Sequence, residues 1–146
     1  MIENSNSARE HPLIKEFLSL VEETVGDGEL SFTNLKSRPF IKFWPFLFIY
    51  KYEKEIDDFR VILYGSHIVN MYGNDFTGKL MSEMGMKEAY RDIHQLNIKI
   101  INGERRVFAS GDFHWQNREH KSWHQVKMPL ERNGTINEVL VCAVIS

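Results

Sequence analysis

The sequence contains little of what stabilises secreted domains or anchors a chain in a membrane. Cys142 is the only cysteine among 146 residues, which excludes an intramolecular disulfide. It lies in the apolar run 139–145, where we expect a small buried core residue rather than a reactive thiol. No apolar stretch reaches the ~20 residues of a membrane span. The first residues also lack the basic and apolar regions of a signal peptide. We therefore expect a cytoplasmic protein that does not associate with a membrane.

An excess of charge of one sign is also lacking. Lys and Arg number 18 and Asp and Glu number 20, which gives a formal net charge of −2. The two signs are interspersed, so no basic patch for nucleic acid is expected. Hydrophobic residues at 42% and charged residues at 26% are typical of a globular domain. We divide the chain into an N-terminal tail with an amphipathic helix, residues 1–28, and a main domain, residues 29–146.

Two segments carry the spacing of amphipathic helices. The first runs from His11 to Val25, and glycines follow it directly. The residues before it are polar, and we expect them to be frayed. The second runs from Lys87 to Ile101 and is expected to bury one apolar stripe against a core. A shorter helix is expected over 67–72.

Five further segments predict a sheet. Runs rich in β-branched and aromatic residues predict strands at 40–52, 59–64, 105–116, 121–131 and 135–145. Asn133-Gly134 predicts a tight turn before the last strand. The unbroken apolar run of that strand predicts a central position with both faces covered. Two strands before the helices and three after them predict an α+β fold. It would be a five-stranded antiparallel sheet with helices on one face, preceded by the N-terminal amphipathic helix.

This order of elements resembles that of the PAS fold, and three short motifs add to the resemblance. Residues 59–66 (FRVILYGS) resemble the second strand and Gly-Ser/Thr turn of a small standalone bacterial PAS subgroup. Residues 73–79 (GNDFTGK) resemble its G-x-D-x-T-G loop, and residues 128–130 (MPL), followed by Asn133-Gly134, resemble its "lPL…dG" ending. Ile62 departs from the pattern, since a polar or basic residue is expected there.

PAS domains are sensory or protein-interaction modules. They hold a small ligand or cofactor between the sheet and the helices, or they hold nothing and dimerise. The resemblance therefore implies a bacterial signal-transduction domain that binds a small ligand or a protein partner and regulates another protein. It implies no catalysis by the chain itself, and it leaves the cofactor unknown.

Aromatic and histidine residues supply the candidate ligand pocket. The side chains expected to face the gap between sheet and helices are Tyr64, His67, Met71, Tyr90 and His94. Haem-binding PAS domains use a helical histidine as the iron ligand, which draws attention to His67 and His94. Neither lies in a recognisable cofactor motif, and a haem site also needs an apolar cavity.

Three more histidines surround a predicted turn at 117–120. If that turn centred on Glu119, His114 would stand opposite His124, with His120 in the turn. A zinc site needs three or four convergent ligands. The spacing of these histidines is not that of a usual zinc motif, so we assign no metal site.

The N-terminal helix must bury its apolar face against the sheet or against another chain. PAS domains often dimerise through a helix that precedes the first strand. The resemblance therefore implies a homodimer, with Leu13, Phe17, Leu20 and Val21 in the interface.

Two other functions remain open from the residues. The first is a small-molecule isomerase or dehydratase on a cone-like α+β fold, which would need a buried acid–base pair. The second is a dimeric interaction scaffold without a ligand. No serine or cysteine nucleophile motif and no phosphate-binding glycine loop is evident.

Overall fold

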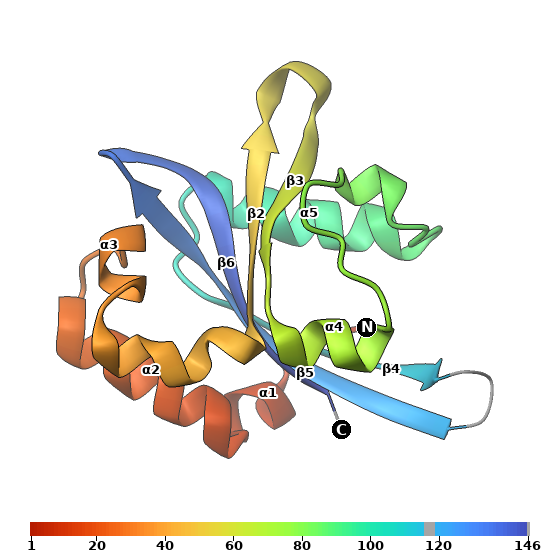
Figure 1. The fold of residues 1–146 in the computed structure, drawn as a ribbon, viewed down its shortest axis with the longest axis horizontal. Helices are drawn as coiled ribbons and strands as arrows, with labels where there is room; N and C mark the ends of the chain where they lie inside the picture. The colour runs from red at the N-terminus through yellow and green to blue at the C-terminus, as the bar shows by residue number, and fades with distance from the viewer. Residues whose placement is uncertain (116–118, 146) are drawn as a thin grey trace.

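The computed structural model describes residues 1–115 and 119–145, and it contains a six-stranded antiparallel sheet (Figure 1). Its elements are β1 (Ile2–Glu3), α1 (Asn6–Glu10), α2 (Pro12–Val25), α3 (Phe32–Leu35), η1 (Arg38–Phe46), β2 (Leu47–Glu53), η2 (Lys54–Ile56), β3 (Asp58–Tyr64), α4 (Ser66–Tyr72), η3 (Met81–Glu83), α5 (Ala89–Ile101), β4 (Val107–Trp115), β5 (Glu119–Arg132) and β6 (Thr135–Ile145). The strand order is β1-β4-β5-β6-β2-β3. Among the helices of this described part, none is long and apolar enough to cross a membrane.

The last strand, β6, lies in the interior of the sheet, as its apolar run predicts. It pairs with β5 on one side and with β2 on the other. Successive side chains point to opposite faces of a strand. Val139 and Val141 accordingly belong to one buried cluster, and Leu140 and Cys142 belong to the other. The sheet therefore separates two hydrophobic cores.

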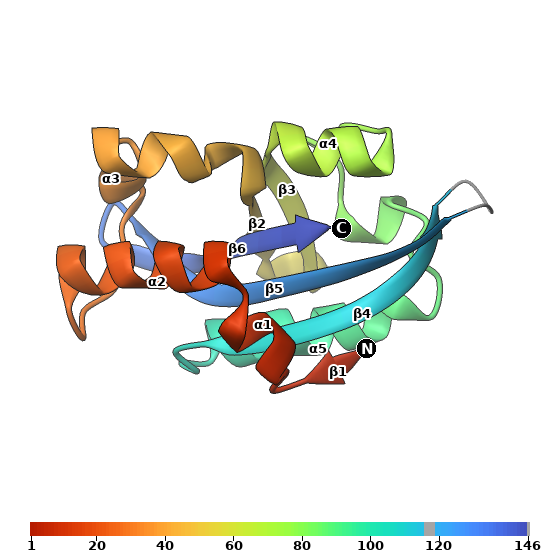
Figure 2. The same ribbon diagram turned by 90° about the horizontal axis from the view of Figure 1, so that it is seen from below.

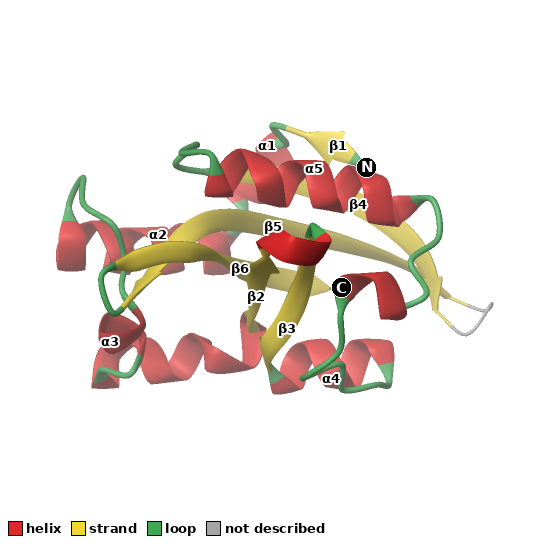
Figure 3. Ribbon diagram, turned by 90° about the horizontal axis from the view of Figure 1, so that it is seen from above, coloured by secondary structure: helices red, strands yellow, loops and turns green. Residues whose placement is uncertain are grey.

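The expectation of helices on one face holds for α4 and α5, and the N-terminal helix α2 covers the other face. On one face, α2 buries Phe17 and Val21 in the cluster that contains Leu140. On the opposite face, α5 buries Leu96 and Ile100 in the cluster that contains Val141. Figures 2 and 3 show α5 on the opposite side of the sheet from α3. The physical reason lies in β6, because a strand that is apolar on both faces needs cover on both.

The N-terminal residues are ordered rather than frayed, and they supply the sixth strand. In β1, Ile2 pairs with Ser110 at the edge of β4. The Ser5 side chain then caps α1 by accepting a hydrogen bond from the Ala8 backbone N–H. The hydroxyl oxygens of Ser5 and Ser110 lie 2.6 Å apart, and Ala8 is fully buried. The polar composition of the segment does not predict these contacts.

The aromatic run 40–52 is only partly a strand. Its first part belongs to η1, which contains Pro45 and buries Phe40 and Phe43 in the core. Proline lacks the N–H that a sheet ladder needs, so the strand begins only at Leu47. A 3₁₀ helix therefore precedes the strand in the first part of this run.

The hairpin of β4 and β5 has a different register from the one considered above. Ser110 pairs with His124, and His114 pairs with His120. Residues 116–118 of the predicted turn lie outside the described part. The register of the flanking pairs differs from one centred on Glu119, and it separates His114 from His124 along the ladder.

Candidate functional site

A cavity of about 500 Å³ lies between the sheet and the elements α4, η3 and α5, and we call it the central cavity. Its lining consists of Phe48, Tyr50, Tyr64, Ile68, Tyr72, Asn74, Phe76, Met84, Gly85, Met86, Ala89, Ile93, Asp112, Trp123, Gln125, Lys127, Ala143 and Ile145. Most of these side chains are aromatic or aliphatic, and a few are polar. This mixture is typical of small-molecule sites, where apolar walls hold the ligand and few polar groups orient it.

The polar part of the lining comes from β5, whose alternate side chains point to the same face of the sheet. Trp123, Gln125 and Lys127 occupy alternate positions and line the cavity. Val126 and Met128, on the other face of the same strand, belong to the opposite core. One strand therefore contributes both to a dry core and to a cavity that contains polar groups.

Gly111 on β4 makes room for the indole ring of Trp123. Gly111 pairs with Trp123 across the hairpin. A Cβ atom at Gly111 would lie 2.4 Å from Cζ2 of Trp123, which is closer than atoms can approach. The absence of a side chain at this position lets the ring lie over the strand.

Lys127 is the most unusual residue of the lining. Its side chain is 1% exposed, and Nζ donates a hydrogen bond to Oδ1 of Asn97 at 2.7 Å. Nζ also lies 5.4 Å from the centre of the Tyr50 ring. None of the ion pairs found within the described residues involves Lys127. Burial penalises the charged form, and it lowers the pKa of the ammonium group to about 7.

The tyrosines of the cavity stay neutral. Burial is the largest cause that raises the pKa of Tyr50, Tyr64 and Tyr72 above the ordinary value. Their hydroxyls are therefore dipolar donors and acceptors rather than charges at physiological pH.

The loop after α4 closes one side of the cavity through Asn74 and Phe76, and it is fixed to the edge of β3. Gly78 N–H donates to the Val61 carbonyl at 2.7 Å, and Val61 N–H donates to the Lys79 carbonyl at 2.9 Å. These bonds satisfy backbone groups that an edge strand otherwise exposes.

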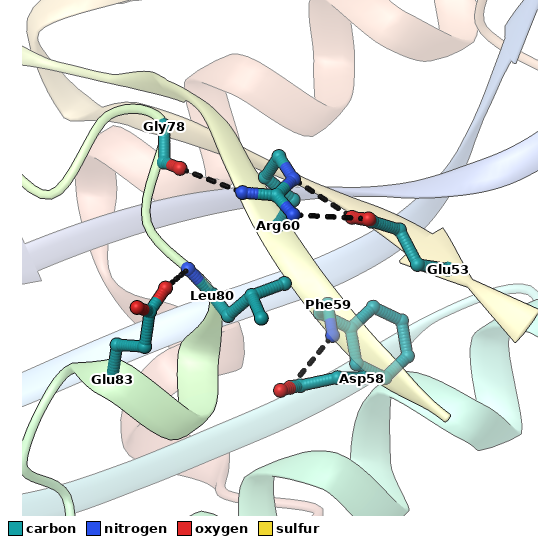
Figure 4. Close-up of polar contacts among 7 residues, drawn as sticks. All are labelled: Glu53, Asp58, Phe59, Arg60, Gly78, Leu80 and Glu83. Atoms are coloured by element: carbon teal, nitrogen blue, oxygen red, sulfur yellow. Dashed lines mark hydrogen bonds and ion pairs between the residues drawn. The ribbon is translucent and has the colours of Figure 1, made fainter. Parts of the chain in front are cut away.

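An arginine strengthens the attachment of the same loop (Figure 4). Arg60 donates to both carboxylate oxygens of Glu53, at 2.7 and 3.1 Å, and to the Gly78 carbonyl at 2.9 Å. Leu80 N–H donates to Glu83 at the start of η3. The arginine of the FRVILYGS motif thus joins β2, β3 and the loop, which is an architectural role.

Within the loop, Asp75 also has an architectural role. Its Oδ1 accepts hydrogen bonds from the backbone N–H of Thr77 at 2.9 Å and from the Thr77 hydroxyl at 2.6 Å. The hydroxyl bond is the largest cause that lowers the pKa of Asp75. The side chain stabilises the turn and does not line the cavity.

The structure separates the five predicted pocket residues. Tyr64 lines the central cavity. The Tyr90 hydroxyl instead donates to Asp58 at 3.1 Å. His94 Nε2 lies 2.9 Å from the Asp57 carbonyl oxygen and 3.2 Å from Asp57 Oδ1. His94 and Asp57 border a separate surface groove near the end of the β2–β3 hairpin.

The two predicted residues on α4 flank the cavity without lining it. His67 Nε2 accepts a hydrogen bond from Ile145 N–H at 3.2 Å, and its ring lies 4.8 Å from that of Phe46. Burial lowers the pKa of His67. Met71 packs against the hydrophobic cluster on the α5 side of the sheet. Ile68 and Tyr72, each one position further along, line the cavity instead.

The four residues predicted for a dimer interface lie on the helix that covers the second face of the sheet. Phe17 and Val21 are fully buried in the core of the chain itself. Leu13 and Leu20 are partly buried and pack against the same cluster. The apolar face of α2 is therefore covered by its own sheet, and a partner chain could reach only the edges of that face.

Within the described residues, no group of three His, Cys, Asp or Glu side chains could hold a metal ion. His124 contacts protein groups instead, because its Nδ1 lies 2.7 Å from the Ser110 hydroxyl. The side chains of His114 and His120 lie outside the described part.

No family model matches the chain, and no curated protein matches it. Among solved structures, it is similar to the PAS-B domain of Drosophila melanogaster Cycle, in a variant with bound glycerol. The identity is 10%, the match covers 68% of this chain and 99% of that chain, and the TM-score is 0.44. A match at this level does not assign the chain to a family.

Proposed function

We propose that the chain is a PAS-type sensory domain that binds a small ligand in the central cavity and regulates another protein. The observation that carries this proposal is the cavity of about 500 Å³, with an aromatic lining and a few polar groups. It lies between the sheet and the helices, the place where the sequence resemblance implied a ligand. A cavity of this size and lining suits a small organic molecule.

A connected set of contacts leads from the cavity to the N-terminal helix. Ile68 lines the cavity from α4, and its neighbour His67 packs on Phe46 of η1. In the same 3₁₀ helix, the ring of Phe43 lies 5.2 Å from that of Phe17 on α2. We propose that ligand binding favours one packing of α4 on η1 and changes the surface that α2 offers to a partner.

The first test is native mass spectrometry of the purified chain, compared with its denatured mass. A co-purified small molecule supports the proposal. The second test is isothermal titration calorimetry with 2-naphthamide, an uncharged aromatic probe. Ala143→Leu places extra atoms in the lining and should weaken binding at least about tenfold, since overpacking displaces the probe. Tyr64→Ala is a second lining variant.

His94→Ala is the matched control, because His94 lies outside the cavity. It should leave probe binding unchanged. Circular dichroism establishes that each variant folds. The proposal fails if no molecule co-purifies and 2-naphthamide does not bind saturably, or if the two lining variants bind it as the wild type does.

One observation favours the enzymatic alternative. An amine that titrates near neutrality can act as a general base, and Lys127 provides one in the cavity. An isomerase or dehydratase also needs an acid partner. The carboxylate in the described lining is Asp112, which is exposed and accepts a hydrogen bond from Ser122 at 2.8 Å. We therefore place the sensory function first, and turnover abolished by Lys127→Met would reverse that order.

A further inference from the structure

Among the described residues, no carboxylate forms an ion pair with the buried side chain of Lys127. A protonated lysine carries three N–H donors. Asn97 Oδ1 accepts one of them, and the Tyr50 ring offers its negative face at 5.4 Å. Burial of an ammonium group without a carboxylate is unfavourable unless a partner arrives. Replacement by an apolar residue would serve a purely structural role better.

We propose that the central cavity binds a small monocarboxylate with an aromatic or apolar body, and that its carboxylate pairs with Lys127 Nζ. This inference rests on the proposed function and names its ligand class. The rings of Phe48, Tyr64 and Trp123 supply apolar walls for the body of the ligand. Gln125, which is 6% exposed and stands next to Lys127 on the same face of β5, supplies an amide donor for the carboxylate.

The charge distribution favours one carboxylate rather than two. Asp112 also belongs to the lining and is exposed, so negative charge enters the cavity from that side. A second carboxylate on the ligand would be repelled there, whereas an apolar end would not. A charge-assisted hydrogen bond in a buried site corresponds to about tenfold to a hundredfold in affinity.

Protonation of Lys127 couples this binding to pH. The titratable groups that face the same cavity are Tyr50 from β2, Tyr64 from β3, Tyr72 from α4 and Asp112 from β4. The three tyrosines stay neutral, because burial raises each pKa. Only the ammonium form attracts a carboxylate. Affinity should therefore be constant below about pH 6 and fall about tenfold between pH 6 and pH 8.

The test compares two probes of one shape by isothermal titration calorimetry. 2-Naphthoate carries the carboxylate, and 2-naphthamide replaces it with an uncharged amide. At pH 6, the wild-type chain should bind the naphthoate about tenfold to a hundredfold more tightly than the amide. That preference should decline about tenfold by pH 8, while the affinity for the amide stays the same.

Lys127→Met removes the charge and keeps the length of the side chain. It should abolish the preference for the naphthoate and its pH dependence, and keep binding of the amide. Lys51→Met is the matched control, because it removes one positive charge from an exposed position on β2. It should change neither.

The outcomes separate this inference from the proposed function. Saturable binding of the amide without a preference for the naphthoate refutes the carboxylate inference and leaves the sensory proposal standing. A preference that survives in Lys127→Met also refutes it. Failure of both probes to bind, with no co-purified molecule, refutes both proposals.

Discussion

Burial of Lys127 predicts a specific dependence of stability on pH. The pKa of its ammonium group falls from an ordinary value of 10.5 to about 7 in the folded chain. Between these values the unfolded chain binds more protons than the folded chain. The free energy of unfolding therefore rises with pH in that interval. Lys127 should contribute about 3 kcal/mol of added stability between pH 7 and pH 9.5.

The predicted rise in the free energy of unfolding ends at about pH 9.5 because two tyrosines of the same cavity oppose it at higher pH. Burial raises the pKa of Tyr50 and Tyr64, so above pH 10 they ionise more readily in the unfolded chain. Their effect opposes that of Lys127. Below pH 7, Lys127 is protonated in both states and its contribution to the slope disappears.

Urea denaturation at half-unit steps from pH 6 to pH 9.5 measures this slope. In Lys127→Met the rise between pH 7 and pH 9.5 should vanish, and the variant should be more stable than the wild type at pH 7. Lys51→Met, at an exposed position, should keep the wild-type slope. An equal slope in the wild type and Lys127→Met would refute the reasoning, because no other change at the site removes a proton-binding group.

Two further substitutions test the packing on either side of the sheet. Phe17→Ala should reduce the free energy of unfolding by about 3–5 kcal/mol, since its ring is fully buried. Leu20 is only partly buried, so Leu20→Ala should reduce the free energy of unfolding by about 1 kcal/mol. Equal losses for Phe17→Ala and Leu20→Ala in urea denaturation would contradict the observed orientation of α2. Gly65→Ala would place a Cβ atom 2.4 Å from the Pro45 carbonyl oxygen, a backbone atom that cannot rotate away. We expect it to cost about 3 kcal/mol or more, and a thermal midpoint within about 2 °C of the wild type would contradict the close approach.

The elements with a strong period were predictable from sequence. The helix from Pro12 to Val25 repeats apolar residues at helical spacing, and the structure ends it at Gly26 as expected. The strand β6 combines an apolar run with an Asn-Gly turn before it, and both features hold in the structure. In these segments local preference and tertiary packing agree.

The remaining differences come from tertiary contacts that leave no local period. The polar N-terminal segment is ordered because β1 pairs with the edge of β4 and the Ser5 hydroxyl contacts that of Ser110. The register of β4 on β5 depends on where the turn forms, which polar residues around 117 do not specify. The number of strands and the second covered face both follow from such contacts.

Of the five residues predicted for the pocket, Tyr64 lines the central cavity, whereas Lys127, its most unusual lining residue, was not among the five. Tyr64 ends a strand that clearly faces the helices. On α4, the prediction of His67 and Met71 was displaced by one position from the lining residues Ile68 and Tyr72, a rotation of about 100° around a helix. The helical spacing alone favours Ile68 and Tyr72, which lie four residues apart on one helical face.

Lys127 was missed because an alternating strand is usually taken to have one wet face. On β5, Gln125 and Lys127 alternate with Val126 and Met128, which would normally indicate a solvated edge of the fold. The neighbouring strand β6 contradicts that interpretation, because it is apolar on both faces and pairs with β5 throughout. A polar face beside a strand that is buried on both sides cannot be solvated. Such a face must meet buried polar partners or a cavity, and here Gln125 and Lys127 meet a cavity with room for a ligand.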